Sequence, residues 1–355
     1  MFFVNLWWLS LIILFYVVIH NLYKKQRCKI HNILLRKCIH LFGTIIFLLS
    51  LFILCRLFVF DLFYIPSDSM EGVLYEKDII LVNKLSYGPK TINANPYTRT
   101  LDRRSEQIIK RLSGFSTIQR NDVVVFRFFK KNDFFVKRCV AIAGDSLYIK
   151  DGIVYVNGQI IKDSNQIKHK YLLDVKNKKA FQIIVNELGI VKSNESRKDN
   201  QYWANLSLEE IMKLSPFLNS FHKVKAKKTV KKKLFPKSIS QEWTIDDYGV
   251  VFIPKQGYKM ELNTENFRIY KGLIAKYEGA KINRIKNGFS VDGVRMTHYT
   301  FKQDYYFMMG DNRCNSYDSR FTGFIPKEKI VGKVSCVFFS NKDNQFQWGR
   351  IGKGV

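Results

Sequence analysis

Two long apolar runs near the N-terminus limit how this 355-residue chain can fold. The first run, residues 1–19, is interrupted only by Asn5 and Ser10, and the second, residues 38–60, contains one charged residue, Arg56. A helix of about 20 residues crosses the hydrocarbon core of a bilayer. Both runs are therefore predicted to be transmembrane helices. Everything after the second run then folds on one side of a membrane.

A basic loop joins the two runs and predicts their orientation. Its lysines and arginines are Lys24, Lys25, Arg27, Lys29, Arg36 and Lys37. Loops rich in Lys and Arg stay in the cytoplasm, so the N-terminus and all residues from Asp61 onward are predicted to be extracytoplasmic. No basic residue precedes the first run, which argues against a cleaved signal peptide. The alternative is a single signal anchor followed by a buried core helix.

The net charge of +28 and the pI near 9.8 suit a nucleic-acid binder, but the two apolar runs and the aromatic content of 15% favour a membrane protein. The basic residues are spread along the chain, with one dense cluster. That cluster consists of Lys223, Lys225, Lys227, Lys228, Lys231, Lys232, Lys233 and Lys237. It is predicted to be a solvated loop, and contact with anionic lipid is the alternative.

The six cysteines form no disulfide pattern, and no disulfide is expected to be required. Cys28, His31, Cys38 and His40 lie close together in the sequence, but their spacing matches no structural zinc site. The chain also contains no phosphate-binding loop and no dinucleotide fingerprint. We therefore expect neither a metal nor a cofactor.

Beyond the second run, the pattern is typical of β-strands. Residues 123–128 and 134–142 are rich in β-branched and aromatic residues and are separated by a short polar turn, which predicts a hairpin. Alternation places Phe135, Lys137 and Cys139 on one face of its second strand. Asp-Gly and Asn-Gly pairs at residues 150–158 and 286–293 predict two further sets of tight hairpins.

Residues 159–285 differ in character and are interpreted as an insertion. The segment Ser207–Glu210 resembles the capping box that begins a helix. Residues 243–253 and 267–277 are predicted to be strands. After the insertion, further strands are predicted within residues 301–309 and 325–339.

The turn that follows the second apolar run contains two serines, Ser67 and Ser69, just outside the predicted membrane. A serine hydroxyl is a weak nucleophile, and it needs a base and a site for the developing oxyanion. A Ser-His-Asp triad would need a histidine, but His169, His222 and His298 lie in or beside the insertion with no matching aspartate pattern. The polar stretch at residues 310–323, rich in Asp, Ser and Arg, suits an ion-paired support for a site.

Three blocks of the sequence together resemble type I signal peptidase (leader peptidase), a family of membrane-anchored Ser/Lys endopeptidases. They are PSDSM with the strand that follows it, VVVFRFFKKNDFFVKRCVAIAGD, and GDNRCNSYDSRFTGFIP. They occur in the family's order and cover about residues 61–158 and 295–340. The resemblance implies a membrane-bound serine endopeptidase that removes signal peptides from exported preproteins, in a multi-pass protein of the bacterial plasma membrane with its catalytic domain on the extracytoplasmic face. Its implied partners are preproteins and the phospholipid bilayer, with no nucleic acid and no obligate protein partner.

The resemblance also implies a role for individual residues. Ser69 corresponds to the nucleophile and Lys137 to the general base, while the Ser67 hydroxyl and the Ser69 amide correspond to the oxyanion donors. Ser316 corresponds to the residue that orients the lysine amine. Ile65 and Val136 match positions that bind small substrate side chains. The residues that would brace the loop around Ser316 are Asp318 and Arg320 and, less directly, Asp311 and Arg313.

The chain departs from the family pattern between the two serines, where Asp68 replaces a common glycine. A carboxylate at this position could raise the pKa of a nearby lysine, or it could face solvent. Lysine acts as a base only when neutral, and lowering its pKa by ~3 units requires about 4 kcal/mol, which burial can supply. Apolar neighbours such as Phe135 are expected to bury Lys137 in this way.

The predicted fold is mainly β, with an antiparallel catalytic domain, an inserted and partly β second domain, and two preceding transmembrane helices. Its predicted parts are transmembrane helix 1 (residues 1–20), a cytoplasmic loop (21–37), transmembrane helix 2 (38–60), the first part of the catalytic core (61–158), the inserted domain (159–294) and the second part of the core with the tail (295–355). Two other functions are considered: a membrane-anchored basic interaction protein, and a soluble, self-cleaving repressor-type Ser/Lys protease. The two apolar runs argue against the second.

Overall fold

The computed structural model describes residues 16–18, 21, 24, 33–90, 111–128, 134–190, 192–193, 200–225, 234–236, 243–342 and 345–355. The chain forms two compact units. Unit 1 combines residues 1–62 with 81–117, and unit 2 combines residues 63–80 with 118–355. The chain enters unit 2 within strand β1 (Phe60–Tyr64) and returns to unit 1 within strand β2 (Ile79–Asn83).

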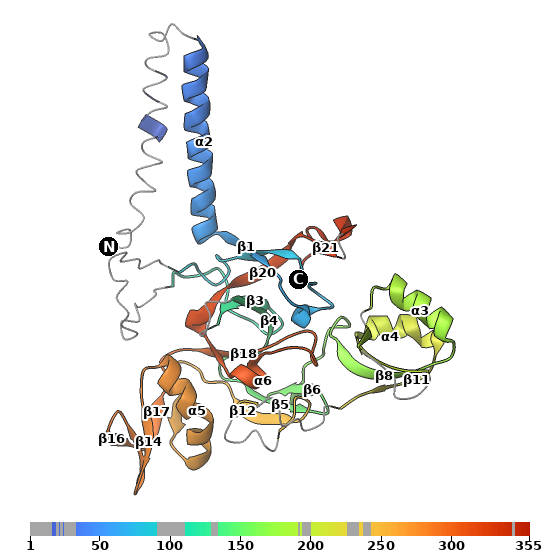
Figure 1. The fold of residues 1–355 in the computed structure, drawn as a ribbon. Coiled ribbons are helices and arrows are strands. Elements are labelled where there is room, and N and C mark those ends of the chain that lie inside the picture. Colours follow the sequence, from blue (N-terminus) through green and yellow to red (C-terminus); the bar gives the residue numbers. More distant parts are fainter. Residues whose placement is uncertain are drawn as a thin grey trace. The chain divides into compact units, whose positions relative to one another are not determined.

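Unit 1 contains the long apolar helix α2 (Ile33–Phe58; Figure 1). Among the described residues, it is the one helix that is long and apolar enough to cross a membrane. It begins before the predicted run at residue 38, and its 26 residues span about 39 Å. Its last turn is stabilised by Lys84, which donates to the Arg56 carbonyl at 2.7 Å and pairs with Asp61 at 2.8 Å. The first predicted span, residues 1–20, lies almost wholly outside the described residues.

Unit 2 is built mainly from antiparallel sheets, as predicted. Within this unit, strands β20, β3, β4, β18 and β19 lie side by side in that order. Their bounds are β3 (Val123–Arg127), β4 (Phe134–Ala141), β18 (Tyr305–Met309), β19 (Ile325–Pro326) and β20 (Ile330–Phe339). The predicted hairpin of β3 and β4 is therefore confirmed, with Val124 opposite Lys137.

A second sheet of unit 2 has the order β12-β5-β6-β7, and its strands are β5 (Ser146–Lys150), β6 (Ile153–Val156), β7 (Gln159–Ile160) and β12 (Tyr248–Phe252). Three strands form a third sheet, namely β14 (Ile282–Ile285), β15 (Gly288–Val291) and β16 (Val294–Met296). The predicted tight hairpins are present, because Asp151-Gly152, Asn157-Gly158 and Asp292-Gly293 all have positive φ at both turn residues, as type I′ turns require.

The remaining short elements of unit 2 are β13 (Lys259–Glu261), β17 (His298–Thr300), β21 (Asn341–Lys342), β22 (Gln345–Phe346), α6 (Ser319–Thr322) and single 3-10 turns at Asp68–Met70, Ser215–Phe217, Lys327–Lys329 and Trp348–Arg350. Strand β13 pairs with β17, and β21 pairs with β22.

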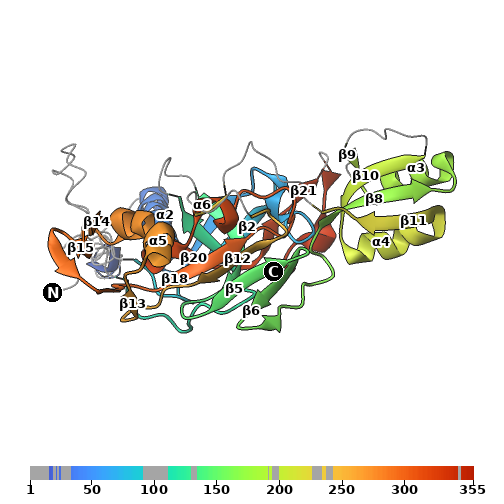
Figure 2. The same ribbon diagram turned by 90° about the horizontal axis from the view of Figure 1, so that it is seen from below.

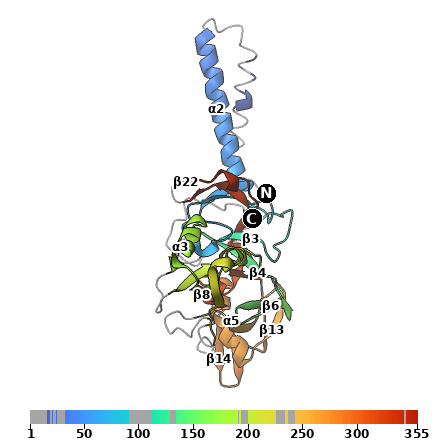
Figure 3. The same cartoon turned by 90° about the vertical axis from the view of Figure 1, so that its right-hand side faces the viewer.

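Part of the predicted insertion forms a lobe with its own core. Its sheet has the order β11-β8-β10-β9, with strands β8 (His169–Val175), β9 (Lys192–Ser193), β10 (Gln201–Leu206) and β11 (Leu218–Lys223). Helices α3 (Lys178–Glu187) and α4 (Leu208–Leu214) cover one face of this sheet (Figures 1 and 3). The core between them includes Leu173, Phe181 and Leu214. The predicted capping box is present, since the Ser207 hydroxyl accepts from the Glu210 amide while the Glu210 carboxylate accepts from the Ser207 amide.

The interpretation of residues 267–277 as a strand was wrong. They belong to helix α5 (Thr264–Tyr277), which lies beside the β14–β16 sheet at the end of unit 2 opposite the α3–α4 lobe (Figure 2). Ile269, Tyr270, Leu273 and Ile274 are all buried, and their spacing has the period of a helix. Asn263 begins the helix by accepting a hydrogen bond from the Asn266 amide.

Candidate active site

Ser69 lies in a single 3-10 turn, Asp68–Met70, that follows the extended residues Ile65–Ser67 in unit 2. Met70 is 1% exposed and anchors the turn in the core. The Ile65 amide donates to the Asp78 carbonyl, and the buried Asp78 carboxylate accepts from Arg350 at 2.6 Å. The chain on either side of Ser69 is thereby held, and the hydroxyl projects from a fixed turn.

Lys137 projects from β4 toward this turn. Its Nζ lies 2.6 Å from Ser69 Oγ and donates to the Val136 carbonyl at 3.0 Å. The residue is only 3% exposed, and its Nζ lies 5.7 Å from the centre of the Phe135 ring. The strand alternation predicted for β4 therefore places the lysine and Phe135 on the same face, as expected.

Burial lowers the pKa of Lys137 from its ordinary 10.5 to about 8, although the charges of Asp318, Asp311 and Asp68 act in the opposite direction. At pH 7, about one Lys137 amine in ten is then neutral. A free lysine would have fewer than one neutral amine in a thousand. The amine beside Ser69 can therefore accept a proton near neutral pH.

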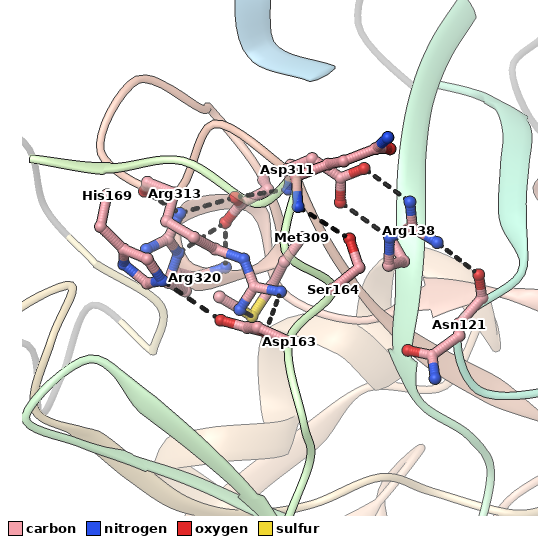
Figure 4. A network of polar contacts seen from close by, with 12 residues as sticks. Asn121, Arg138, Asp163, Ser164, His169, Met309, Asp311, Arg313 and Arg320 are labelled. Atoms are coloured by element: carbon pink, nitrogen blue, oxygen red, sulfur yellow. Dashed lines mark hydrogen bonds and ion pairs between the residues drawn. The ribbon is translucent and has the colours of Figure 1, made fainter. Parts of the chain in front are cut away.

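The two buried carboxylates near Lys137 are each held by an arginine. Arg320 donates to both oxygens of Asp318, at 2.9 and 2.8 Å, and both residues are buried. Arg138 donates to both oxygens of Asp311, at 2.8 and 2.7 Å (Figure 4). Burial alone would raise the pKa of Asp318, but Arg320 holds it below its usual range. The two arginines offset charges that would otherwise favour the ammonium form of Lys137.

The four residues predicted to brace the loop around Ser316 all form ion pairs. Asp318 pairs with Arg320, Asp311 with Arg138, and Arg313 with Asp163 at 2.9 Å (Figure 4). Asp163 also lies 3.2 Å from the His169 ring. Residues 311–313 are thus connected both to strand β4 and to the start of the α3–α4 lobe.

Ser67 and Ser316 lie close to Ser69. The Ser67 hydroxyl is 3.3 Å from Ser69 Oγ. The Ser69 amide lies in the first turn of the 3-10 segment, where amide groups lack intrahelical partners. Ser316 Oγ is buried and makes no hydrogen bond to Lys137 among the contacts of the described residues, and its hydroxyl is one of the groups that lower the pKa of Asp318. Its role in orienting the amine stays a prediction.

Gly310 lies where the Ser69 turn and the loop that carries Ser316 pack closely together. A Cβ at this position would overlap the Ser316 hydroxyl and lie 2.5 Å from the Ser69 carbonyl oxygen. The Gly310 amide also donates to Asp318 at 3.1 Å. Any other residue here would displace either the nucleophile turn or the loop that carries Ser316.

The two positions predicted to bind substrate side chains lie close in the sequence to Ser69 and Lys137. Ile65 is 3% exposed, four residues before Ser69, and Val136 is half-buried and precedes Lys137 on β4. In the described part of the chain, β18 pairs with β4 only from Arg138 onward. Residues Phe134–Lys137 are therefore unpaired by β18 on the side of β4 opposite β3.

A serine hydroxyl in contact with a base that is partly neutral can attack a carbonyl group. No group of three or more His, Cys, Asp or Glu residues in the described ranges is placed to hold a metal. A serine hydroxyl in contact with a buried amine, within this antiparallel fold, assigns the protein to the class of serine hydrolases.

Comparison with known proteins identifies the family. The model of the signal peptidase family, peptidase S26, matches residues 38–230 and 254–339, so the chain belongs to this family and is a serine endopeptidase that cleaves signal peptides. A signal peptidase I of Buchnera aphidicola subsp. Schizaphis graminum is 28% identical over 293 residues, which are 82% of this chain and 72% of the relative. A signal peptidase I of Helicobacter pylori is 26% identical over 303 residues, 84% of this chain and 80% of the relative.

Among solved structures, a signal peptidase I from Enterococcus faecalis V583 matches 62% of this chain and 98% of that chain at 15% identity. Its TM-score of 0.23 is too low to bear on the fold.

Several residues of the site had no sequence signal. Three contacts join residues that lie more than 100 positions apart along the chain: Arg138 with Asp311, Asp163 with Arg313, and Asn312 with Asp68. Arg138 also makes a shorter-range contact with the Asn121 carbonyl. In the sequence, Arg138 is distinguished only as the neighbour of Lys137. Asn312 was not singled out, although its amide donates to the Ser69 carbonyl at 3.1 Å.

Proposed function

We propose that Ser69 and Lys137 form the catalytic dyad of a membrane-anchored signal peptidase, with Ser69 as nucleophile and neutral Lys137 as general base. The main support is the 2.6 Å distance between Lys137 Nζ and Ser69 Oγ inside a buried site. Because the pKa of Lys137 is about 8, part of the amine population is also neutral at physiological pH. General bases work best when their pKa lies near the operating pH.

In the proposed reaction, Ser69 Oγ attacks the carbonyl carbon of the scissile bond while its proton passes to Lys137 Nζ. The tetrahedral intermediate then expels the amine of the mature protein, which takes that proton as the C–N bond breaks. An ester between Ser69 and the signal peptide remains. Water attacks this ester with Lys137 again accepting a proton, and the carboxyl product leaves as Ser69 regains its hydrogen.

The oxyanion is proposed to be stabilised by the Ser67 hydroxyl and the Ser69 amide. Ser67 Oγ lies 3.3 Å from the attacking oxygen, on the turn that also presents the Ser69 N–H. Donors that are already oriented toward a developing charge lower the barrier without reorganising. Asp318, Arg320, Asp311 and Arg313 are proposed to keep the loop around Ser316 in place, through the ion pairs described above.

The substrate is proposed to add to β4 as a strand. Residues Phe134–Lys137 offer backbone groups that β18 does not pair with in the described chain. A cleavage site with small residues at the first and third positions before the cut is an extended segment of this kind. Alternate side chains of an added strand point the same way, so both can enter small pockets beside Ile65 and Val136.

The membrane arrangement is proposed to be two spans, residues 1–20 and 38–60, joined by a cytoplasmic loop at 21–37. The catalytic core (61–158 and 295–355) and the inserted domain (159–294) then lie on the extracytoplasmic face of a bacterial plasma membrane. The apolar helix α2 supports the second span. In spheroplasts, external protease should degrade residues 61–355, and protection of these residues would contradict the orientation. The partners are preproteins and the bilayer, with neither nucleic acid nor an obligate protein partner.

The dyad is tested by cleavage of a model preprotein by the purified full-length protein in lipid vesicles. Ser69→Ala should abolish cleavage, and the wild-type rate should rise with pH through about 8 as Lys137 loses its proton. Normal processing by Ser69→Ala would refute Ser69 as the nucleophile, whereas no cleavage by the wild type would favour an interaction protein. An acid limb that persists unchanged in Lys137→Met would mean that the base is another residue.

A further inference from the structure

A second buried lysine, Lys168, lies at the start of the α3–α4 lobe, one residue before β8. Only 2% of it is exposed, and its Nζ contacts two carboxylates, Glu71 at 3.1 Å and Glu210 at 2.9 Å. Glu71 lies two residues after Ser69, and Glu210 lies in the first turn of α4. The ammonium group therefore connects the nucleophile turn to a helix of the lobe.

Lys168 holds its proton more firmly than Lys137 does. Burial alone would lower the pKa of Lys168, but Glu210 and Glu71 raise it above its ordinary value. A buried ammonium that lost either carboxylate would be left partly uncompensated, which is strongly unfavourable. The three side chains therefore hold one another in place.

A second route leads from Glu71 to the nucleophile through Asn312. The Asn312 side chain donates to Glu71 at 3.4 Å and to the Asp68 carbonyl at 3.3 Å. The Asn312 backbone N–H donates to the Ser69 carbonyl at 3.1 Å. In addition, Asn205 of β10 donates to the Asn312 side chain at 3.3 Å. A shift of Glu71 would thus be transmitted through Asn312 to Asp68 and Ser69, whose carbonyl groups Asn312 binds.

The backbone around Lys168 packs directly on the same turn. The Lys168 amide donates to the Asp311 carbonyl at 2.9 Å, and the Arg313 amide donates to the Lys168 carbonyl at 3.0 Å. Gly72, at φ +105°, allows the Gln166 carbonyl to approach, and a Cβ there would overlap that oxygen. The segment 166–168 therefore contacts both the nucleophile turn and the 311–313 loop.

We propose that Lys168 is a positioning residue for Ser69, which makes the orientation of the nucleophile depend on the docked α3–α4 lobe. This inference rests on the proposed role of Ser69. Lys168 acts through Glu71 and Asn312, and its ammonium bonds to neither Ser69 Oγ nor Lys137 Nζ among the contacts of the described chain. Its side chain sets where the nucleophile lies and takes no part in proton transfer.

Replacing Lys168 with Met leaves Glu71 and Glu210 facing each other without the cation. The two carboxylates repel, and Glu71 moves away with the turn that bears Ser69. A misplacement of about 1 Å in a catalytic group can lower the rate by roughly 100-fold. We expect kcat for preprotein cleavage to fall by roughly 10- to 100-fold in Lys168→Met, with KM changed less than about two-fold, because the substrate-binding half of β4 is untouched.

The experiment compares kcat, KM and melting temperature for the full-length wild type, Lys168→Met, Lys168→Arg and the control Lys213→Met, which removes an exposed lysine of α4. Loss of kcat in Lys168→Met at temperatures well below its melting point, with substantial recovery in Lys168→Arg, supports the proposal. A purely structural role would lower the melting temperature and leave kcat of the folded protein unchanged. That result, or equal losses in Lys168→Met and Lys168→Arg, would overturn it.

Glu210→Gln decides the question if Lys168→Met does not fold. It keeps the shape of the side chain and the contact of Lys168 with Glu71, and it weakens the link to α4 together with the Glu210 half of the capping box. A fall of kcat by roughly 3- to 10-fold at unchanged KM supports the coupling, and an unchanged kcat excludes it. Ser69→Ala is assayed alongside. If Ser69→Ala remains active, the proposed dyad fails; if it is inactive while kcat of the Lys168 and Glu210 variants is normal, only the positioning role fails.

Discussion

The site around Lys137 and the junction around Lys168 each bury a lysine beside the turn that bears Ser69, yet the pKa values of the two lysines are shifted in opposite directions. Lys168 touches two carboxylates, which raise its pKa, whereas burial lowers the pKa of Lys137 to about 8. Lys137 bonds instead to a hydroxyl and a carbonyl. Direct contact with a carboxylate, rather than burial alone, decides which lysine has the raised pKa.

Arginines offset part of the charge of the two buried carboxylates near Lys137. Asp318 and Asp311 are both buried, but each is held at two points by an arginine. The fold thus separates two uses of buried charge. Around Lys168, the charges attract and join structural parts, while around Lys137, arginines offset the acids and leave the amine available for chemistry.

The largest effect is expected when Lys137 is given a permanent charge. Arg cannot lose its proton at any accessible pH, so Lys137→Arg keeps a cation on β4 but removes the base. The rate of preprotein cleavage should fall by roughly 100- to 10,000-fold, and its dependence on pH near 8 should disappear. Lys213→Arg on the exposed face of α4 is the control and should cleave normally. Retained activity in Lys137→Arg would show that the contrast between the two lysines is irrelevant to catalysis.

The second effect concerns the arginine that neutralises Asp318. Arg320→Met leaves a buried carboxylate without its partner, which should lower the free energy of unfolding by about 3–5 kcal/mol, measured by urea denaturation. In any folded fraction, the acid limb of the rate profile should move to higher pH, because an uncompensated Asp318 favours the ammonium form of Lys137. Arg284→Met, at an exposed arginine of β14, should change neither quantity. Equal stability of both variants would contradict the neutralising role.

Sequence reasoning selected Ser69 and Lys137, which the structure brings into contact, because the two residues lie in short, recognisable blocks. Ser69 lies in a Pro-initiated turn, and Lys137 lies on a strand whose alternation is visible in the sequence. The hairpins of unit 2 were predictable because Asp-Gly and Asn-Gly pairs have a local preference for positive φ. Local chemistry therefore predicted both the nucleophile turn and much of the β architecture.

The partners that set the charge of each lysine were not predictable in the same way. Arg138 meets Asp311 and Lys168 meets Glu71 across separations of 173 and 97 residues, and nothing local distinguishes these side chains from surface charges. Helix α5 was missed for a different reason. Its apolar residues follow the helical period, but β-branched and aromatic residues among them favoured a strand interpretation.

A third prediction tests the cost of burying Lys137. Its folded pKa, about 8, is below the ordinary 10.5, so below pH 8 the folded protein must bury a charged amine that the unfolded chain leaves in water. The cost is fully present below pH 8 and is relieved as the pH rises toward 10.5. The Lys137→Met variant does not have this cost. Its free energy of unfolding relative to that of the wild type should therefore decline by roughly 3 kcal/mol between pH 7 and 10.5.

Urea denaturation at several pH values measures this difference, with Lys213→Met as the exposed control that should show no trend. The lost hydrogen bonds to Ser69 and Val136, about 1 kcal/mol each, lower the stability of Lys137→Met equally at every pH. The slope with pH is therefore more informative than the absolute value. A flat difference would mean that Lys137 is not desolvated in the folded protein.

The smallest effect is expected at Asp68, the exposed carboxylate between the two serines. Its charge raises the pKa of Lys137 less than Asp318 and Asp311 do, since it faces water. Asp68→Asn keeps an oxygen that can accept from Asn315, which donates to the Asp68 carboxylate at 2.7 Å, and removes only the charge. The acid limb of the rate profile should move to lower pH by less than about one unit, with a higher rate at pH 7.

Glu187→Gln on α3 removes an equal charge far from Ser69 in the sequence and should leave the profile in place. An acid limb that moves upward in Asp68→Asn would show that this carboxylate assists catalysis directly, because its electrostatic effect on Lys137 can only act in the other direction.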